Sequence, residues 1–202
     1  MADARAAWIW AVVAVAVVVP MAIAAASPLL AWRDPVYIAA GFAGILAMVL
    51  LLFQPLLAAG YLTGLPARRE RQVHRVIGAI LVLAVLLHVA GLWVTSPPDV
   101  MDALLFASPT SFSIWGVIAM WAIFATALLV TFRRRLPMKG RTWRRCHSGL
   151  ALVIVLGSVS HAMLIDGTMG TVSKAALCAL VVAGTIKALI DLKVFARRTI
   201  LR

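Results

Sequence analysis

The chain alternates long apolar runs with short polar breaks. About 20 apolar residues are needed for a helix to cross the hydrocarbon layer of a bilayer. The runs that meet this length cover residues 7–26, 36–59, 74–95, 113–132, 147–165 and 172–191. Proline, glycine and charged residues mark the breaks, for example at Ser27, Asp34 and Pro97. The pattern predicts an all-α integral membrane protein, built as a bundle of six transmembrane helices.

Composition agrees with this pattern. The 202 residues are 64% hydrophobic, with a mean hydropathy of +1.03, which is outside the range of soluble globular proteins. No polar segment is long enough to form a separate soluble domain, so we expect residues 1–202 to be a single transmembrane domain. The first apolar run is longer than the core of a usual signal peptide, and we expect it to remain as an uncleaved helix.

Basic residues are distributed very unevenly along the chain. The net charge of +12 alone is compatible with nucleic acid or anionic lipid as a partner. With six spans, however, all but two of the 19 Lys and Arg residues fall on one side of the membrane, and only Arg33 and Lys174 fall on the other. The positive-inside rule then places both termini in the cytoplasm. We therefore expect a multi-pass protein of a bacterial inner membrane, with no nucleic-acid partner.

The four histidines form two pairs with the same spacing. His74 and His88 lie in the third run, and the interval between them is repeated between His147 and His161 in the fifth. This interval is close to four helical turns, or roughly 21 Å of rise, and it keeps both members of a pair on one helix face. The third and fifth runs are parallel, so His74 is level with His147 and His88 with His161. The sequence thus predicts two histidine pairs at two different depths in the membrane.

Ionisable side chains inside a membrane are costly and usually functional, and neutral imidazole is a common ligand of haem iron. The pattern favours two six-coordinate haems with the four histidines as axial ligands. Three alternatives remain. The histidines are packing residues, or they bind zinc, although zinc needs about four ligands in one cluster. They also suit a proton relay, but that needs acidic partners in the membrane, and none is present in the two runs that contain the histidines.

The neighbours of the histidines give weaker signals. Gly78 and Gly157 lie one turn from His74 and His161, where a small residue would leave room for a flat macrocycle. Ordinary helix packing explains these glycines equally well. The basic residues beside His74 and His147, the pair nearer the cytoplasmic side, are candidates for pairing with haem propionates. The alternative explanation is that membrane topology alone accounts for their positive charge. These residues are Arg75, Arg144 and Arg145.

Several motifs are missing from the sequence. It has no G-x-G-x-x-G, no phosphate-binding loop and no C-x-x-C-H for covalent haem attachment. The chain therefore suits electron transfer but not hydride collection, and flavin is expected on a partner protein. The basic segment 133–145 offers a docking surface for an acidic flavoprotein, and contact with anionic lipid also explains its charge.

Two segments carry a resemblance to a known family. The strings RQVHRVIGAILVLAVLLH (Arg71 to His88) and WRRCHSGLALVIVLGSVSH (Trp143 to His161) resemble the ferric reductase-like transmembrane domain. That superfamily includes ferric reductases, NADPH oxidases and the haem-binding subunit of the periplasmic methionine sulfoxide reductase system. The resemblance covers about residues 36–165. The chain lacks the fused flavin and nicotinamide domains of the oxidases and is similar in size to stand-alone bacterial members.

The resemblance implies two b haems, or sometimes one, that carry electrons from a cytosolic flavin to the far side of the membrane. It also implies that His74 pairs with His147, and His88 with His161. Our first hypothesis is accordingly a di-haem b-type cytochrome with a cytosolic NAD(P)H or flavin reductase as donor. The external acceptor would be ferric iron, a periplasmic reductase or oxygen.

Two further hypotheses remain open at this point. One is a quinone-linked membrane cytochrome b that anchors a larger oxidoreductase. The other is a transporter or structural membrane protein whose histidines bind no haem, although no inverted repeat or broken midplane helix is evident in the sequence.

Overall fold

A computed structural model describes residues 2–62, 64 and 66–195 of the chain. Some of the basic residues that the topology prediction assigns to the cytoplasmic side lie outside these described residues. They are Arg197, Arg198 and Arg202. Everything below concerns the described part of the chain.

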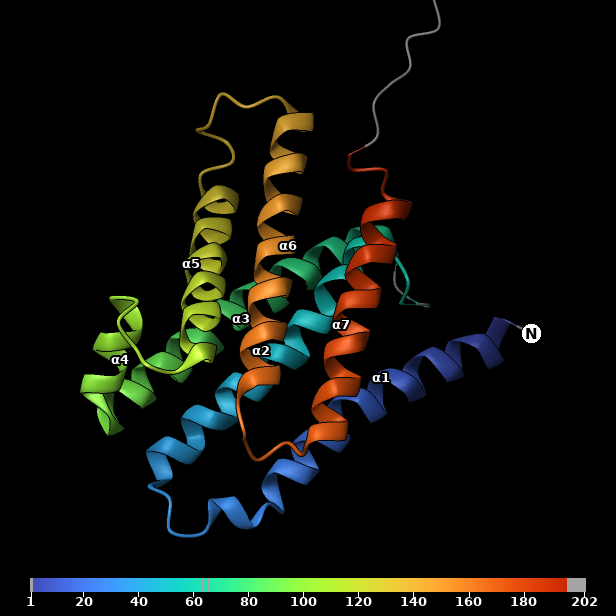
Figure 1. The fold of residues 1–202 in the computed structure, drawn as a ribbon. Helices are drawn as coiled ribbons and strands as arrows, with labels where there is room; N and C mark the ends of the chain where they lie inside the picture. The colour runs from blue at the N-terminus through green and yellow to red at the C-terminus, as the bar shows by residue number, and fades with distance from the viewer. Residues whose placement is uncertain (1, 63, 65, 196–202) are drawn as a thin grey trace, which may run out of the picture.

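The structure is a bundle of helices (Figure 1). The elements are α1 (Ala2–Ala25), a short 3₁₀ helix η1 (Pro28–Leu30), α2 (Pro35–Ala58), α3 (Ala67–Thr95), α4 (Pro97–Leu104), α5 (Ser111–Thr131), α6 (Gly140–Leu164) and α7 (Thr171–Asp191). Within the described residues there is no strand, and six helices are long and apolar enough to cross a membrane: α1, α2, α3, α5, α6 and α7. The predicted all-α membrane bundle with six spans is confirmed.

Two helices begin earlier than the apolar pattern indicates. α3 starts at Ala67 rather than at residue 74, and α6 starts at Gly140 rather than at residue 147. The added turns of both helices contain Arg, and those of α3 also contain Glu70. Both residue types favour helix formation although they are charged, so hydropathy marks the membrane boundary and not the helix end. His74 and His147 therefore lie about two turns inside their helices. The apolar pattern also misses α4, whose two prolines occupy its first turn, where proline is well tolerated.

The membrane helices form two antiparallel hairpins. α2 packs along α3 and α5 packs along α6, while α7 contacts α2 and α6; α5 and α6 stand side by side in Figure 1. Small residues allow both close approaches: a Cβ atom at Gly91 would lie 2.7 Å from the Ala40 Cβ, and one at Gly157 would lie 2.9 Å from the Trp115 carbonyl oxygen. By contrast, α3 and α6 have few backbone contacts with each other. The hairpins thus face each other across a space that side chains of α3 and α6 must fill.

Polar contacts hold both ends of α7. At one end, the buried Lys174 donates from Nζ to the carbonyl oxygen of Ile165, the residue that caps α6, at 2.5 Å. This bond satisfies a carbonyl that the end of a helix would otherwise leave unpaired. At the other end, the Tyr61 hydroxyl donates to Asp191 Oδ2 at 2.5 Å, and Lys187 Nζ donates to the same oxygen at 2.7 Å. Partial burial and the bond to Asp191 raise the pKa of Tyr61 above its ordinary value.

We expect Tyr61→Phe to lower the thermal midpoint of the detergent-solubilised protein by roughly 1–2 °C, because one exposed hydrogen bond is removed from a chain of this size. Tyr37→Phe is the matched control, since its ring is stacked under Arg33 and its hydroxyl makes no hydrogen bond in the described chain. The bond needs a protonated phenol. Its stabilisation should therefore be complete below the ordinary tyrosine pKa and disappear as pH rises through the raised pKa. Equal thermal midpoints for Tyr61→Phe and Tyr37→Phe would contradict a stabilising role of the Tyr61 hydroxyl.

Candidate functional site

The four histidines face one another as two pairs between the hairpins. The ring centres of His74 on α3 and His147 on α6 are 6.4 Å apart, with their planes inclined at 64°. The ring centres of His88 and His161 are also 6.4 Å apart, with an angle of 79°. Each pair joins α3 to α6, which otherwise barely touch. The structure thus brings together all four histidines singled out in the sequence, at two levels of the bundle.

The rings of the outer pair, His88 and His161, are each held by a backbone carbonyl of the neighbouring helix. His88 Nδ1 lies 2.7 Å from the Ala40 carbonyl oxygen on α2, and His161 Nδ1 lies 2.9 Å from the Phe112 carbonyl oxygen on α5. A carbonyl oxygen only accepts hydrogen bonds, so Nδ1 must carry the proton in both rings. In a neutral imidazole the lone pair is then on Nε2, the tautomer typical of a metal-ligating histidine.

A glycine lies behind each ring of the outer pair, one helical turn after the carbonyl that holds it. A Cβ atom at Gly44 would lie 3.0 Å from His88 Nδ1, and a Cβ atom at Gly116 would lie 2.6 Å from His161 Nδ1. The second distance is too short for any side chain unless the imidazole moves. The two hairpins therefore build the outer level in the same way, with a carbonyl that orients the ring and a glycine that makes room for it.

The inner pair, His74 and His147, is built less symmetrically. His74 Nδ1 lies 3.2 Å from the carbonyl oxygen of Gln54. The interval from Ala40 to Gln54 equals the interval between the two histidines of α3, so α2 offers one carbonyl to each ring. His147 has no such bond: its Nδ1 is buried without a hydrogen-bond partner among the described residues. Its ring instead stacks on Trp143, with centres 5.1 Å apart and planes inclined by 7°.

The other residues singled out in the sequence have simpler surroundings. A Cβ atom at Gly78 would meet the Gln54 side chain at 3.8 Å, an ordinary contact, whereas Gly157 is pressed against α5. The position of Gly157 is that of a helix-packing residue, the alternative that the sequence leaves open. The three arginines beside the inner histidines are exposed and form no hydrogen bond or ion pair with other described residues. They are Arg75, Arg144 and Arg145.

The spacing within each pair suits one metal ion between two rings. Two metal–nitrogen bonds of about 2 Å, plus roughly 1 Å from each nitrogen to its ring centre, span about 6 Å. Both pairs match this span. Each level offers two imidazoles, and no group of three or more His, Cys, Asp or Glu residues within the described chain is arranged to hold a metal ion. The donor set therefore fits an iron whose remaining ligands come from a macrocycle, and it does not fit the four-ligand cluster that zinc needs.

Several residues of this arrangement were missed by sequence reasoning. Nothing in the sequence distinguishes Ala40, because it contributes only its carbonyl group. Phe112 contributes its carbonyl and also a ring that meets the His161 ring edge to face, with centres 5.8 Å apart. Gly44 and Gly116 also look like ordinary packing residues as long as the positions of the imidazole rings are unknown. Trp143 carried a readable signal, since it precedes His147 by one helical turn and so lies on the same face.

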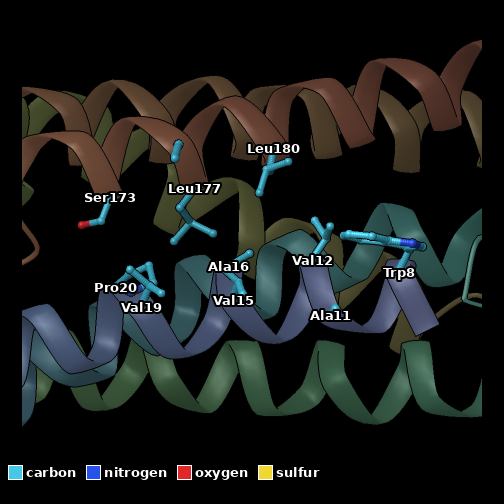
Figure 2. Close-up of a pocket in the computed structure, with 11 residues that line it drawn as sticks. Trp8, Ala11, Val12, Val15, Ala16, Val19, Pro20, Ser173, Leu177 and Leu180 are labelled. Carbon is cyan, nitrogen blue, oxygen red and sulfur yellow. The ribbon is translucent and has the colours of Figure 1, made fainter. Parts of the chain in front are cut away.

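An apolar groove lies elsewhere in the bundle. It has a volume of about 280 Å³ and runs between α1 and α7, where side chains such as Trp8, Val12 and Leu177 point into it (Figure 2). No histidine lines the groove, and Ser173 is its one hydroxyl-bearing residue. It offers no set of ligands for a metal ion, so the histidine pairs remain the candidate site.

Comparison with known proteins gives one family. No curated protein and no solved structure shows significant similarity to the chain. A family model described as ferric reductase like transmembrane component matches residues 41–158. The match covers more than half of the chain and contains most of the hairpins α2–α3 and α5–α6, with three of the four histidines inside it and His161 just beyond its end. The protein therefore belongs to the ferric reductase-like transmembrane component family.

Proposed function

We propose that the protein is a di-haem b-type cytochrome that carries electrons across a bacterial inner membrane. Its donor is a cytosolic flavin or NAD(P)H reductase, and its acceptor is an external protein or a small molecule such as ferric iron or oxygen. The observation that supports this proposal is the pair of facing imidazoles at each of two levels, with ring centres 6.4 Å apart. Family membership supports a role in membrane electron transfer.

The residues of the chain have three tasks in this proposal. The four imidazoles would hold the haem iron through Nε2, and backbone carbonyls of α2 and α5 hold three of the rings in the tautomer that this requires. Gly44 and Gly116 make room for the outer rings. Haem iron, when bound, supplies the one-electron redox chemistry that no side chain here provides.

The space between the two levels is apolar. Leu81 and Val85 on α3 and Ile154 on α6 lie between the levels along their helices, and all three are buried in the same core cluster. Apolar side chains exclude water and lower the local dielectric, which is one of the ways in which a protein sets a redox potential. The levels are roughly 21 Å apart along the helices, so the bundle offers one electron carrier near each membrane surface.

Orientation follows from charge. Helix ends near His74 and His147 carry most of the basic residues, and the positive-inside rule assigns that end to the cytoplasm. The inner pair is then the entry point for electrons, and the basic surface around it suits an acidic flavoprotein. The outer pair is the exit point.

The decisive experiment is the haem content of the purified full-length chain. We expect the pyridine haemochrome assay to give two b haems per chain, with low-spin spectra because both axial positions are filled. Separate His88→Ala and His147→Ala variants should each lose one haem and keep the other. If the wild-type chain, expressed with ample haem, contains none, the electron-transfer proposal is wrong and the transporter or structural alternative gains support.

We expect Gly116→Ala to weaken the outer haem site, because its new methyl group would lie 2.6 Å from His161 Nδ1. Gly41→Ala on α2 is the matched control, since a Cβ atom there meets nothing within 4 Å. Haem per chain should fall in the first variant and stay at the wild-type value in the second. Retention of full haem content by Gly116→Ala, with an unchanged spectrum, would show that the ring position does not matter.

The orientation can be tested with two engineered cysteines in a Cys146→Ser background. Lys139→Cys and Arg33→Cys replace exposed basic residues on opposite sides of the membrane, and the remaining native thiol, Cys178, is buried. A membrane-impermeant maleimide should label the residue-33 thiol in spheroplasts and the residue-139 thiol only in inverted vesicles. The reverse pattern would place both termini outside the cytoplasm.

A further inference from the structure

The inner histidine pair differs from the outer pair in one respect. Three of the four imidazoles donate Nδ1–H to a carbonyl of a neighbouring helix, but His147 does not. By the repeat of the two hairpins, its partner would be the carbonyl of Thr126, which follows Phe112 at the same interval as Gln54 follows Ala40. The structure records no such bond. His147 must therefore be held in another way.

Trp143 provides the contact that His147 otherwise lacks. Its indole is stacked on the imidazole, with ring centres 5.1 Å apart and planes inclined by 7°, and the Arg133 guanidinium lies over the indole at 5.2 Å. The indole thus contacts both the imidazole and a guanidinium group at the start of α6. The other three histidines have no aromatic residue one turn before them: the corresponding positions are Glu70, Ala84 and Gly157. His161 does have an aromatic neighbour, Phe112, but these two rings meet edge to face, with centres 5.8 Å apart and planes inclined by 68°. Among the described histidines, parallel stacking is therefore specific to the one ring without a carbonyl acceptor.

Stacking and hydrogen bonding act differently on a ligand. Both restrict the orientation of the ring, but only a hydrogen bond from Nδ1–H increases the electron donation of the imidazole to a metal. Trp143 therefore restricts the orientation of the His147 ring without increasing its electron donation. The indole Nε1 is also buried without an acceptor in the described chain, so the indole contributes its face to this contact and no hydrogen bond.

We propose that Trp143 is the positioning residue of His147, and that stacking replaces at this ring the carbonyl bond that orients the other three. The proposal rests on the di-haem function proposed above. It predicts that the two levels hold haem differently. In the outer site both histidines are oriented by a carbonyl hydrogen bond, whereas in the inner site His74 is oriented by such a bond and His147 by stacking. Loss of the stack should therefore affect the inner haem alone.

The test compares Trp143→Leu and Trp143→Phe in the purified full-length chain, with Trp121→Leu as the matched control. Trp121 is an exposed tryptophan of α5 that contacts Phe124 and no histidine. Haem content, electron paramagnetic resonance signals and a redox titration are measured for each variant. We expect Trp143→Leu to lose about half of the haem or to shift the signal and potential of one haem only. Trp143→Phe, which keeps a stacking ring, should stay close to wild type.

Three outcomes would overturn the proposal. They are unchanged haem content and potentials in Trp143→Leu, loss of both haems in that variant, and an equal effect of Trp121→Leu. The wild-type haem count tests the proposed function separately. If the wild type holds no haem, histidine-selective NMR of the same proteins decides: a ring-current shift of one histidine signal that vanishes in Trp143→Leu supports the positioning, and its absence from the wild type refutes it.

Discussion

The hydrogen bond from an imidazole Nδ1–H to a backbone carbonyl is the interaction on which the candidate site depends. In hydrocarbon a polar group without a partner costs several kcal/mol, so an acceptor within the bundle stabilises a buried histidine, and three of the four histidines have one. A helix carbonyl has a second lone pair beyond the one used in its own helix. Ala40, Gln54 and Phe112 supply that lone pair. The same bond lowers the cost of burial, fixes the tautomer and leaves the lone pair of the neutral ring on Nε2.

The arrangement of helices agrees with this bond. Three histidines lie against the helix that supplies their carbonyl, His74 and His88 against α2 and His161 against α5, and accordingly α3 packs on α2 and α6 packs on α5. Close packing within each hairpin then requires glycine where a ring or backbone approaches, as at Gly44, Gly91 and Gly116. Between the hairpins the packing is different: α3 and α6 have few backbone contacts with each other, and the two histidine pairs span the distance between them.

Much of this was predictable from the sequence, and the rest has identifiable causes. Hydropathy located the six spans and histidine spacing located two levels, since both depend on helical periodicity alone. The early starts of α3 and α6 were missed because charged residues continue a helix outside the hydrocarbon. The acceptor carbonyls were unpredictable because a backbone group leaves no mark in the sequence. The Gln54 carbonyl is one such group, and only the structure shows that it holds His74.

The two levels also face different physical conditions, and their construction reflects this. The outer rings meet α2 and α5 near the beginnings of those helices, where each finds a carbonyl and a glycine. At the inner level α5 is close to its end at Thr131, and α6 has just begun at Gly140. The polar segment between them brings Arg133 over the indole of Trp143, so the histidine nearest this segment, His147, lies against an indole that a cationic group also contacts, where the other three histidines lie against a backbone carbonyl.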